Sequence, residues 1–237
     1  MNLKARCMPR TLREFVSFFR SQSLQRDELL GKITDIYSRV WPCKFDDKDL
    51  QTFLGLLYCS VRFYRPSIVV QTGTFVGTST IAISLAMRAN RKGALFTIDP
   101  EPREYFGVAN PVSIARQAVS SGRLDAHVQF VRGYSTVPGD RQRMQLPHAP
   151  WWRLTNLPTG ALWNMFVVDG DHTYVGCSAD LCYGGLRVKR EGRGLVIVHD
   201  YIGIPDVRRA VREWRRTAVP LQSLVVPSPC GIALIQV

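Results

Sequence analysis

The chain has 237 residues, 46% of them hydrophobic, and a formal net charge of +12. This length suits one α/β domain with an N-terminal extension, and the hydrophobic content can form a sizeable core. No apolar run reaches the roughly 18 residues that a membrane-spanning helix needs, so we expect no membrane span.

The charge leaves nucleic acid or another polyanion open as a partner. Because the basic residues are dispersed, a merely solvated basic surface is the favoured interpretation. The six cysteines form no CxxC pair, which indicates a reduced, cytoplasmic chain and not a disulfide framework. The first 13 residues faintly resemble a transit peptide, but an amphipathic segment follows at once.

Residues 11–40 carry apolar side chains at roughly helical spacing. Asp46 and Asp47 predict the start of a second helix that ends near Phe63. Together these helices would form an N-terminal helical cap, residues 1–66. The cap is expected to pack on the core, with a lid over a site or a homodimer interface as alternatives.

Strands and helices alternate in the rest of the chain, which predicts an α/β fold with a doubly wound parallel sheet. We expect a loop at 100–111, and residues 136–163 show no clean period. The last two strands should form an antiparallel pair. The expected strands are 67–71, 94–98, 127–131, 165–168, 194–198, 221–226 and 231–236, and the expected helices are 78–89, 112–121, 173–188 and 205–216.

A glycine turn, Gly73 to Gly77, joins the first strand to the next helix. It lacks the GK[ST] of a P-loop and the second glycine of a dinucleotide fingerprint. A helix N-terminus with hydroxyls at Thr78 to Thr80 suits a carboxylate-bearing ligand such as S-adenosylmethionine. Asp99 ends the second strand, 22 residues after Gly77. A carboxylate at this place can accept hydrogen bonds from ribose hydroxyls.

Ionisable residues follow two later strands, at the sheet edge where such folds bind ligands. Two interpretations are open. Asp169 and Asp200 would hold a divalent metal ion, or a side chain of the group would act as a metal-free general base. The residues are Asp169, Asp171, His172, His199 and Asp200.

Four stretches together resemble the class I S-adenosylmethionine-dependent methyltransferases, in particular the branch with catechol, caffeoyl-CoA and macrolide-sugar O-methyltransferases. The stretches are VVQTGTFVGTST, FTIDPEP, FVVDGDHTYVG and VIVHDY. The resemblance covers roughly residues 51–237. It implies a Rossmann-like sheet of seven strands in the order 3-2-1-4-5-7-6, with one antiparallel strand, and a methyltransferase domain at 67–237.

The resemblance also implies residue roles. Gln71 stands where the family usually has an acid, and its amide can still bond the cofactor's ammonium group, without the ion pair. A magnesium or manganese ion would bind Asp169 and Asp200, and His199 favours manganese or zinc over magnesium. The implied cofactor contacts are Gly73, Phe75, Gly77 and Ser79 at the methionine end, Asp99 at the ribose, Gly133 and Ser135 at the adenine, and Asp169 near the sulfonium.

The sequence therefore predicts an enzyme that transfers a methyl group from S-adenosylmethionine to a hydroxyl of a small-molecule acceptor. Asp171, His172 and His199 are the candidate catalytic residues. Two alternatives stay open: an acceptor that is RNA or another polyanion, and a degenerate methyltransferase fold that serves as a scaffold.

Overall fold

The computed structural model describes residues 11–133, 163–188 and 194–237. Its centre is a seven-stranded sheet in the order β5-β2-β1-β6-β7-β9-β8. In this sheet β9 runs opposite to the other strands, so its pairings with β7 and β8 are both antiparallel. This is the predicted order 3-2-1-4-5-7-6, so the predicted fold class is confirmed. The strands are β1 (Ile68–Thr72), β2 (Ala94–Asp99), β5 (Val128–Arg132), β6 (Met165–Val168), β7 (Leu195–Val198), β8 (Gln222–Val226) and β9 (Ile232–Gln236).

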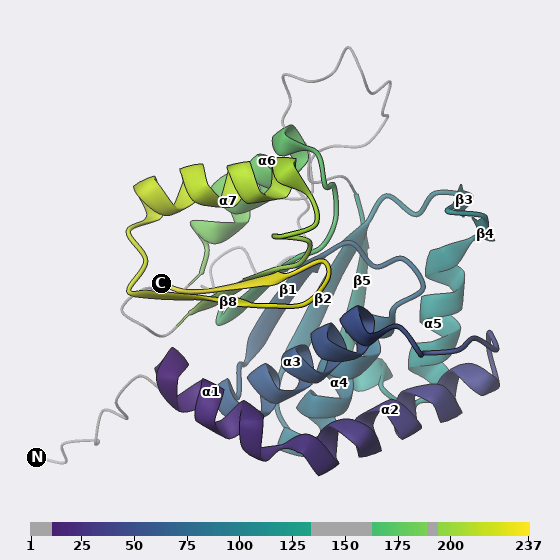
Figure 1. Cartoon of the computed structure of the whole chain (residues 1–237). Helices are drawn as coiled ribbons and strands as arrows, with labels where there is room; N and C mark the ends of the chain where they lie inside the picture. The colour runs from purple at the N-terminus through teal and green to yellow at the C-terminus, as the bar shows by residue number, and fades with distance from the viewer. Residues whose placement is uncertain (1–10, 134–162, 189–193) are drawn as a thin grey trace, which may run out of the picture.

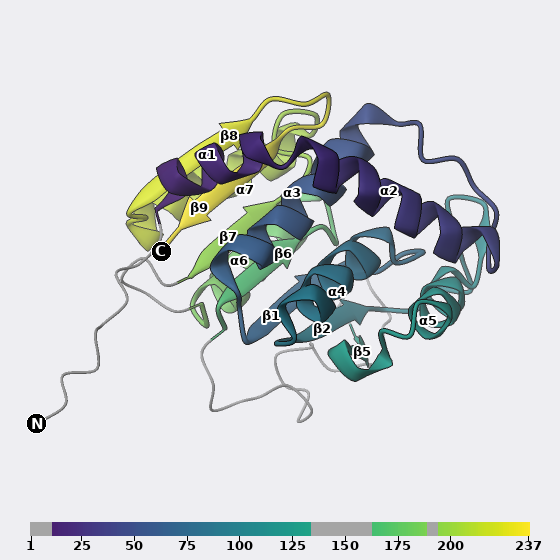
Figure 2. The same cartoon turned by 90° about the horizontal axis from the view of Figure 1, so that it is seen from below.

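Helices cover both faces of the sheet (Figures 1 and 2). One layer consists of α1 (Leu12–Ser21), α2 (Ser23–Ser38), α3 (Lys48–Tyr64), α4 (Thr78–Asn90) and α5 (Pro111–Ser121). The other consists of α6 (Tyr174–Gly185) and α7 (Pro205–Ala218). A short 3-10 turn, Asp125–His127, precedes β5. None of the described helices is long and apolar enough to cross a bilayer.

Alternating side chains of the central strands supply both cores. Val69 of β1 packs in the cluster of α1, α3 and α4, whereas Val70 packs in the cluster of α6 and α7. Both side chains are fully buried. Burying one such side chain contributes about 1.5–3 kcal/mol, so a parallel strand buried on both faces has a continuous apolar run in its sequence.

The N-terminal helices share this core. Leu12, Phe15 and Phe53 lie in one cluster with Val167 and other residues of the sheet. Asp47 begins α3 by accepting hydrogen bonds from the backbone N–H groups of Asp49 and Leu50. The helical layer therefore packs directly on the strands that carry the candidate site.

Two expected elements differ. The expected loop at 100–111 contains a small hairpin of β3 (Glu104–Tyr105) and β4 (Val108–Ala109), whose turn has positive φ at Phe106 and Gly107. The helix expected at 173–188 ends at Gly185, because the chain then leaves the helix to pair Val188 with Trp163.

Candidate active site

The carboxyl ends of the parallel strands form one edge of the sheet. Backbone hydrogen bonds continue past each strand: Gly133 donates to the Asp99 oxygen (3.0 Å), Asp169 to that of Thr72 (3.1 Å), and His199 to that of Val168 (3.1 Å). Because β5, β2, β1, β6 and β7 are neighbours in this order, the predicted residues line up as Gly133, Asp99, Gly73, Asp169 and His199.

The two glycines of the turn are required by packing against the protein itself. Gly73 has φ +81°, and a Cβ there would lie 1.9 Å from the backbone oxygen of Asp169. Gly77 has φ +87°, and its Cβ would lie 2.6 Å from the Cβ of Ala115. The family resemblance implied that both glycines contact the methionine end of the cofactor. The structure gives a different reason for them, and their contact with the cofactor stays a prediction.

Asp99 closes the glycine turn with its carboxylate. Its Oδ2 accepts from the backbone N–H of Thr74 (2.9 Å) and Phe75 (3.2 Å), and its Oδ1 accepts from that of Glu101 (2.8 Å). Each carboxylate oxygen has two lone pairs, so Oδ1 keeps capacity for a further donor. A ribose hydroxyl suits that remaining position.

Gln71 is fully buried beneath the same turn. Its Nε2 donates to the Gly73 backbone oxygen (2.5 Å) and to Ser79 Oγ (2.8 Å) at the start of α4. Its Oε1 is buried without a hydrogen-bond partner. An unpaired buried acceptor is unfavourable by about 1–3 kcal/mol, so a ligand ammonium group that donates to Oε1 would remove this penalty. The structure therefore fits the predicted contact of Gln71 and Ser79 with the methionine end.

The hairpin that the sequence pattern did not predict packs on the glycine turn. The ring of Phe75 lies 5.9 Å from that of Tyr105 and 6.4 Å from that of Phe106, both edge-on. Burial raises the pKa of Tyr105, and the charges of Asp171, Asp99 and Asp169 raise it further. The hairpin thus lies within electrostatic reach of the carboxylates at the strand ends.

Two histidines and two aspartates form a single charged group beside Gly73, which we call the histidine–aspartate group (Asp169, His172, His199 and Asp200). His199 Nδ1 lies 3.2 Å from Asp169 Oδ1 and 3.1 Å from Asp200 Oδ2. His172 Nε2 lies 2.8 Å from Asp200 Oδ2 and 3.7 Å from Asp169 Oδ1. The His172 Nε2 atom is buried and makes no aligned hydrogen bond.

A positive φ of 58° at Asp200 explains how two successive residues reach the same group. Neighbouring side chains of an extended strand point to opposite faces. The left-handed conformation after β7 turns the Asp200 carboxylate back toward His199. Aspartate tolerates this conformation better than most residues.

The charges of the group are mutually dependent. Burial lowers the pKa of His199, but hydrogen bonding to Asp169 and Asp200 outweighs it and raises that pKa to about 11. Contacts with Asp169 and Asp200 also raise the pKa of His172, to about 9, against the effect of burial. Burial alone would raise the pKa of both carboxyl groups, yet the histidines hold each below its ordinary value. Without a bound cation, two imidazolium ions therefore neutralise this site near pH 7.

Asp49, the second residue of α3, belongs to the site although the sequence pattern did not single it out. Its Oδ2 lies 3.1 Å from His199 Nε2, and Phe53 stacks on the imidazole with ring centroids 4.1 Å apart. Asp49 and His199 are 150 residues apart, and Asp49 follows the predicted N-cap, where an acid is ordinary. No sequence signal distinguished it from a helix-terminal carboxylate.

The remaining predicted residues divide into two sets. Asp171 accepts a hydrogen bond from the Thr173 backbone N–H (2.9 Å), next to the start of α6. No contact of Asp171 with His172 or His199 is among its described hydrogen bonds, and a catalytic role for it stays a prediction. Gly133 is buried beside Asp99. Ser135 lies outside the described residues.

Asp169, His199 and Asp200 offer three donor atoms that lie within 4.8 Å of one another. Two carboxylates and an imidazole suit manganese or zinc better than magnesium, which prefers oxygen ligands alone. The contact of His199 Nε2 with Asp49 leaves Nδ1 on the side of the carboxylates, the arrangement typical of a metal-binding histidine. The side chains present therefore fit a divalent ion.

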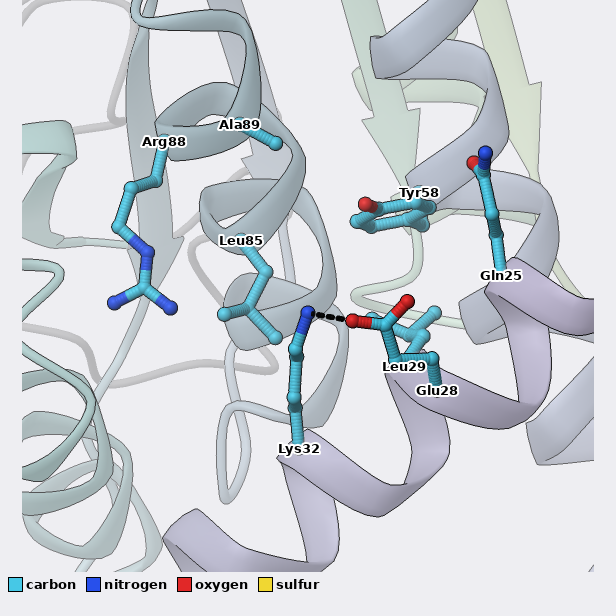
Figure 3. Close-up of a pocket in the computed structure, with 8 residues that line it drawn as sticks. All are labelled: Gln25, Glu28, Leu29, Lys32, Tyr58, Leu85, Arg88 and Ala89. Carbon is cyan, nitrogen blue, oxygen red and sulfur yellow. Dashed lines mark hydrogen bonds and ion pairs between the residues drawn. The ribbon is translucent and has the colours of Figure 1, made fainter.

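A small pocket of about 120 Å³ lies elsewhere, among α2, α3 and α4 (Figure 3). Lys32 and Glu28 form an ion pair at its mouth, and Arg88 extends beside Leu85. None of the residues that line it belongs to the predicted site. The pocket gives no support to a second catalytic centre.

Comparisons with known proteins agree with this fold. A family model described as "Methyltransferase domain" matches residues 70–201. No curated protein matches the chain. Among solved structures, the O-methyltransferase TomG from Streptomyces achromogenes, in complex with S-adenosylmethionine, is similar with 17% identity and a TM-score of 0.58, covering 94% of this chain and 96% of that one.

Two further structures have the same fold. An O-methyltransferase from Bacillus cereus in complex with S-adenosylhomocysteine has 12% identity and a TM-score of 0.56, covering 94% of this chain and all of that one. A methyltransferase from Podospora anserina bound to S-adenosylhomocysteine has 13% identity and a TM-score of 0.53, covering 89% and 87%. At such identities the likeness concerns the fold.

Proposed function

The chain belongs to the family of this methyltransferase domain, and we propose that it transfers the methyl group of S-adenosylmethionine to a hydroxyl of a small molecule. The proposal depends above all on the order of residues along the sheet edge. Asp99, Gly73, Asp169 and His199 follow one another on β2, β1, β6 and β7. An extended cofactor with its ribose at Asp99 and its amino-acid end at the glycine turn would direct its sulfonium toward the histidine–aspartate group.

The bound cofactors of two similar O-methyltransferases, S-adenosylmethionine and S-adenosylhomocysteine, support the choice of cofactor. In this chain Gln71 and Ser79 would bind the ammonium end and Asp99 the ribose. Gly133 would lie beside the adenine, next to Ser135. The sheet then fixes cofactor and acceptor in line, and positioning of this kind supplies much of the rate of a two-substrate reaction.

Asp169, His199 and Asp200 would hold a manganese or zinc ion, whose chemistry is to lower the pKa of the acceptor hydroxyl. We assign the proton transfer to His172, whose Nε2 points into the group. A bound cation would offset the charges of Asp169 and Asp200, so they would raise the pKa of His172 less strongly. The imidazole would then be neutral closer to pH 7 and could accept the hydroxyl proton.

Titration calorimetry with S-adenosylhomocysteine, with and without manganese, zinc or magnesium, tests the proposal. We expect binding without metal and a tighter manganese than magnesium site. Asp99→Asn should weaken cofactor binding, whereas Asp125→Asn, the same change at an exposed aspartate, should leave it unchanged. Transfer of labelled methyl to a panel of phenols and sugars measures the reaction. Absence of cofactor binding would refute the proposal.

Further predictions from the sequence stay proposals. We place the chain in the cytoplasm because Cys43, Cys59, Cys177, Cys182 and Cys230 are free thiols. The division into a helical cap at 1–66 and a methyltransferase domain at 67–237 stays a prediction, as does a homodimer. A polyanionic acceptor such as RNA is a separate prediction, which steep salt dependence of RNA binding would support.

A further inference from the structure

One face of α3 holds the imidazole of His199 at two places. Asp49 contacts the Nε2 edge at 3.1 Å. Phe53 stacks on the ring, with an interplanar angle of 27°. Residues four apart share a helix face, so a single turn of α3 provides both contacts. The N-terminal helical layer is thus a wall of the reaction centre.

Asp49 is itself held in place. Its other oxygen, Oδ1, accepts a hydrogen bond of 2.9 Å from the backbone N–H of Cys230, in the turn between β8 and β9. The residue is 5% exposed. Its two oxygens thus face two N–H positions, that of the Cys230 backbone at Oδ1 and that of the imidazole at Oδ2.

A carboxylate at Nε2 decides what that nitrogen does. Nε2 must donate its N–H to Asp49, and a nitrogen that donates offers no lone pair. The other nitrogen, Nδ1, faces Asp169 and Asp200 at 3.2 and 3.1 Å. Without a cation the imidazolium donates from both nitrogens. A metal ion in the histidine–aspartate group would replace the Nδ1 proton and leave the Nε2–H on Asp49.

We propose that Asp49 is a positioning residue: it holds the Nε2–H of His199 and thereby directs Nδ1 to the reacting group between Asp169 and Asp200. The proposal rests on the proposed function for the purpose of that group. The hydrogen bond itself can be measured without any activity. Asp49 also links α3 and the β8–β9 turn to the centre.

Asp49→Asn is the sharpest substitution, because it keeps the shape and reverses one contact. The oxygen of the new amide must still accept from the Cys230 N–H, which turns the amide N–H₂ group toward His199 Nε2. When zinc occupies Nδ1, the amide N–H₂ group and the Nε2–H would then face each other, which should weaken the zinc site. Asp46→Asn is the matched control, since Asp46 is an exposed acid three residues earlier.

Nitrogen-15 NMR of the zinc-loaded, histidine-labelled full chain measures the outcome, with His199 assigned from the His199→Asn spectrum. In the wild type and in Asp46→Asn, we expect zinc at Nδ1 and a protonated Nε2. In Asp49→Asn, we expect zinc affinity and kcat to fall about 10–100-fold, with cofactor affinity within about twofold. Zinc at Nε2 of the wild type, or no zinc at His199, overturns the proposal.

Unchanged zinc affinity in Asp49→Asn also overturns it, whether or not kcat falls. If that variant does not fold, the wild-type spectrum decides together with Phe53→Leu, which removes the stacking and should keep Nε2 protonated. A protonated Nε2 in a chain that binds no S-adenosylhomocysteine would overturn the proposed function and leave the hydrogen bond to Asp49 in place. The two failures are therefore distinguishable.

Discussion

The hydroxyl of Tyr37 donates a hydrogen bond of 2.6 Å to the backbone oxygen of Val76. Tyr37 lies in α2, is fully buried, and burial raises the pKa of its hydroxyl, which therefore stays protonated as a donor. Val76 belongs to the glycine turn between Gly73 and Gly77. An N-terminal helix thus supports the segment that we assign to the cofactor.

Tyr37→Phe should lower the free energy of unfolding by about 1–3 kcal/mol, because it leaves the buried Val76 oxygen without a donor. We also expect weaker binding of S-adenosylhomocysteine, since the turn loses its support. Urea denaturation and titration calorimetry measure the two effects. Tyr58→Phe, a change in the pocket of Figure 3, is the control. Cofactor affinity unchanged in Tyr37→Phe would show that the turn does not depend on α2.

A comparison of Gly73→Ala with Gly107→Ala separates the effect of steric overlap on the free energy of unfolding from the effect of backbone strain. Both glycines have positive φ, +81° and +73°, but a Cβ at Gly107 meets nothing within 4 Å. The change at Gly107 should lower the free energy of unfolding by roughly 1–2 kcal/mol, the effect of strain alone. At Gly73 the overlap with the Asp169 oxygen should add about 3 kcal/mol or more. Equal losses in denaturation experiments would refute the packing account.

Gln71→Glu should destabilise the free protein and strengthen cofactor binding. The new carboxylate would face the Gly73 backbone oxygen, to which Gln71 Nε2 donates in the wild type. The free energy of unfolding should therefore fall by about 1–3 kcal/mol. A ligand ammonium group would then gain an ion pair. The rise in melting temperature on adding S-adenosylhomocysteine is therefore expected to exceed that of the wild type. A smaller rise would place the ammonium group away from Gln71.

Stability should fall as the pH rises above neutrality. The pKa of His199 is raised from 6.5 to about 11 in the folded chain. A raised pKa means that the ion pairs stabilise the fold fully below pH 6.5 and that this contribution is lost progressively toward pH 11. Denaturation of metal-free protein between about pH 7 and 10 measures the slope. His199→Asn should flatten it, and an unchanged slope in that variant would assign the effect to other groups.

The strands of the central sheet were predictable from sequence because they are buried on both faces. Met165 to Val168 form a continuous apolar run between Asn164 and Asp169, and β6 has those bounds. Polar residues after such runs mark the sheet edge, so Asp99, Asp169 and His199 could be placed there. The strand order followed from the family resemblance, not from the residue pattern.

The sequence pattern could not predict contacts between segments that lie far apart in the chain. Asp49 looks like any acid at a helix start, and only the packing of α3 on β7 brings it to His199. The hairpin at Glu104–Ala109 has two-residue strands, too short to show an alternation. Its turn uses Phe106-Gly107, whereas Asn-Gly is the pair that typically signals such a turn. The packing that requires glycine at Gly73 and Gly77 likewise involves Asp169 and Ala115, which are distant in the sequence.

Backbone hydrogen bonds that continue past the strand ends divide the candidate site into a part held by the sheet and a part on the small hairpin. Asp169 and His199 are held by backbone hydrogen bonds to Thr72 and Val168, so a change of backbone there disturbs the neighbouring central strands. Phe106 lies on the small hairpin, 83% exposed. An exposed side chain of this kind can vary at little cost in stability. Selectivity for an acceptor could therefore diverge through the hairpin among relatives of this chain while the reacting group stays constant.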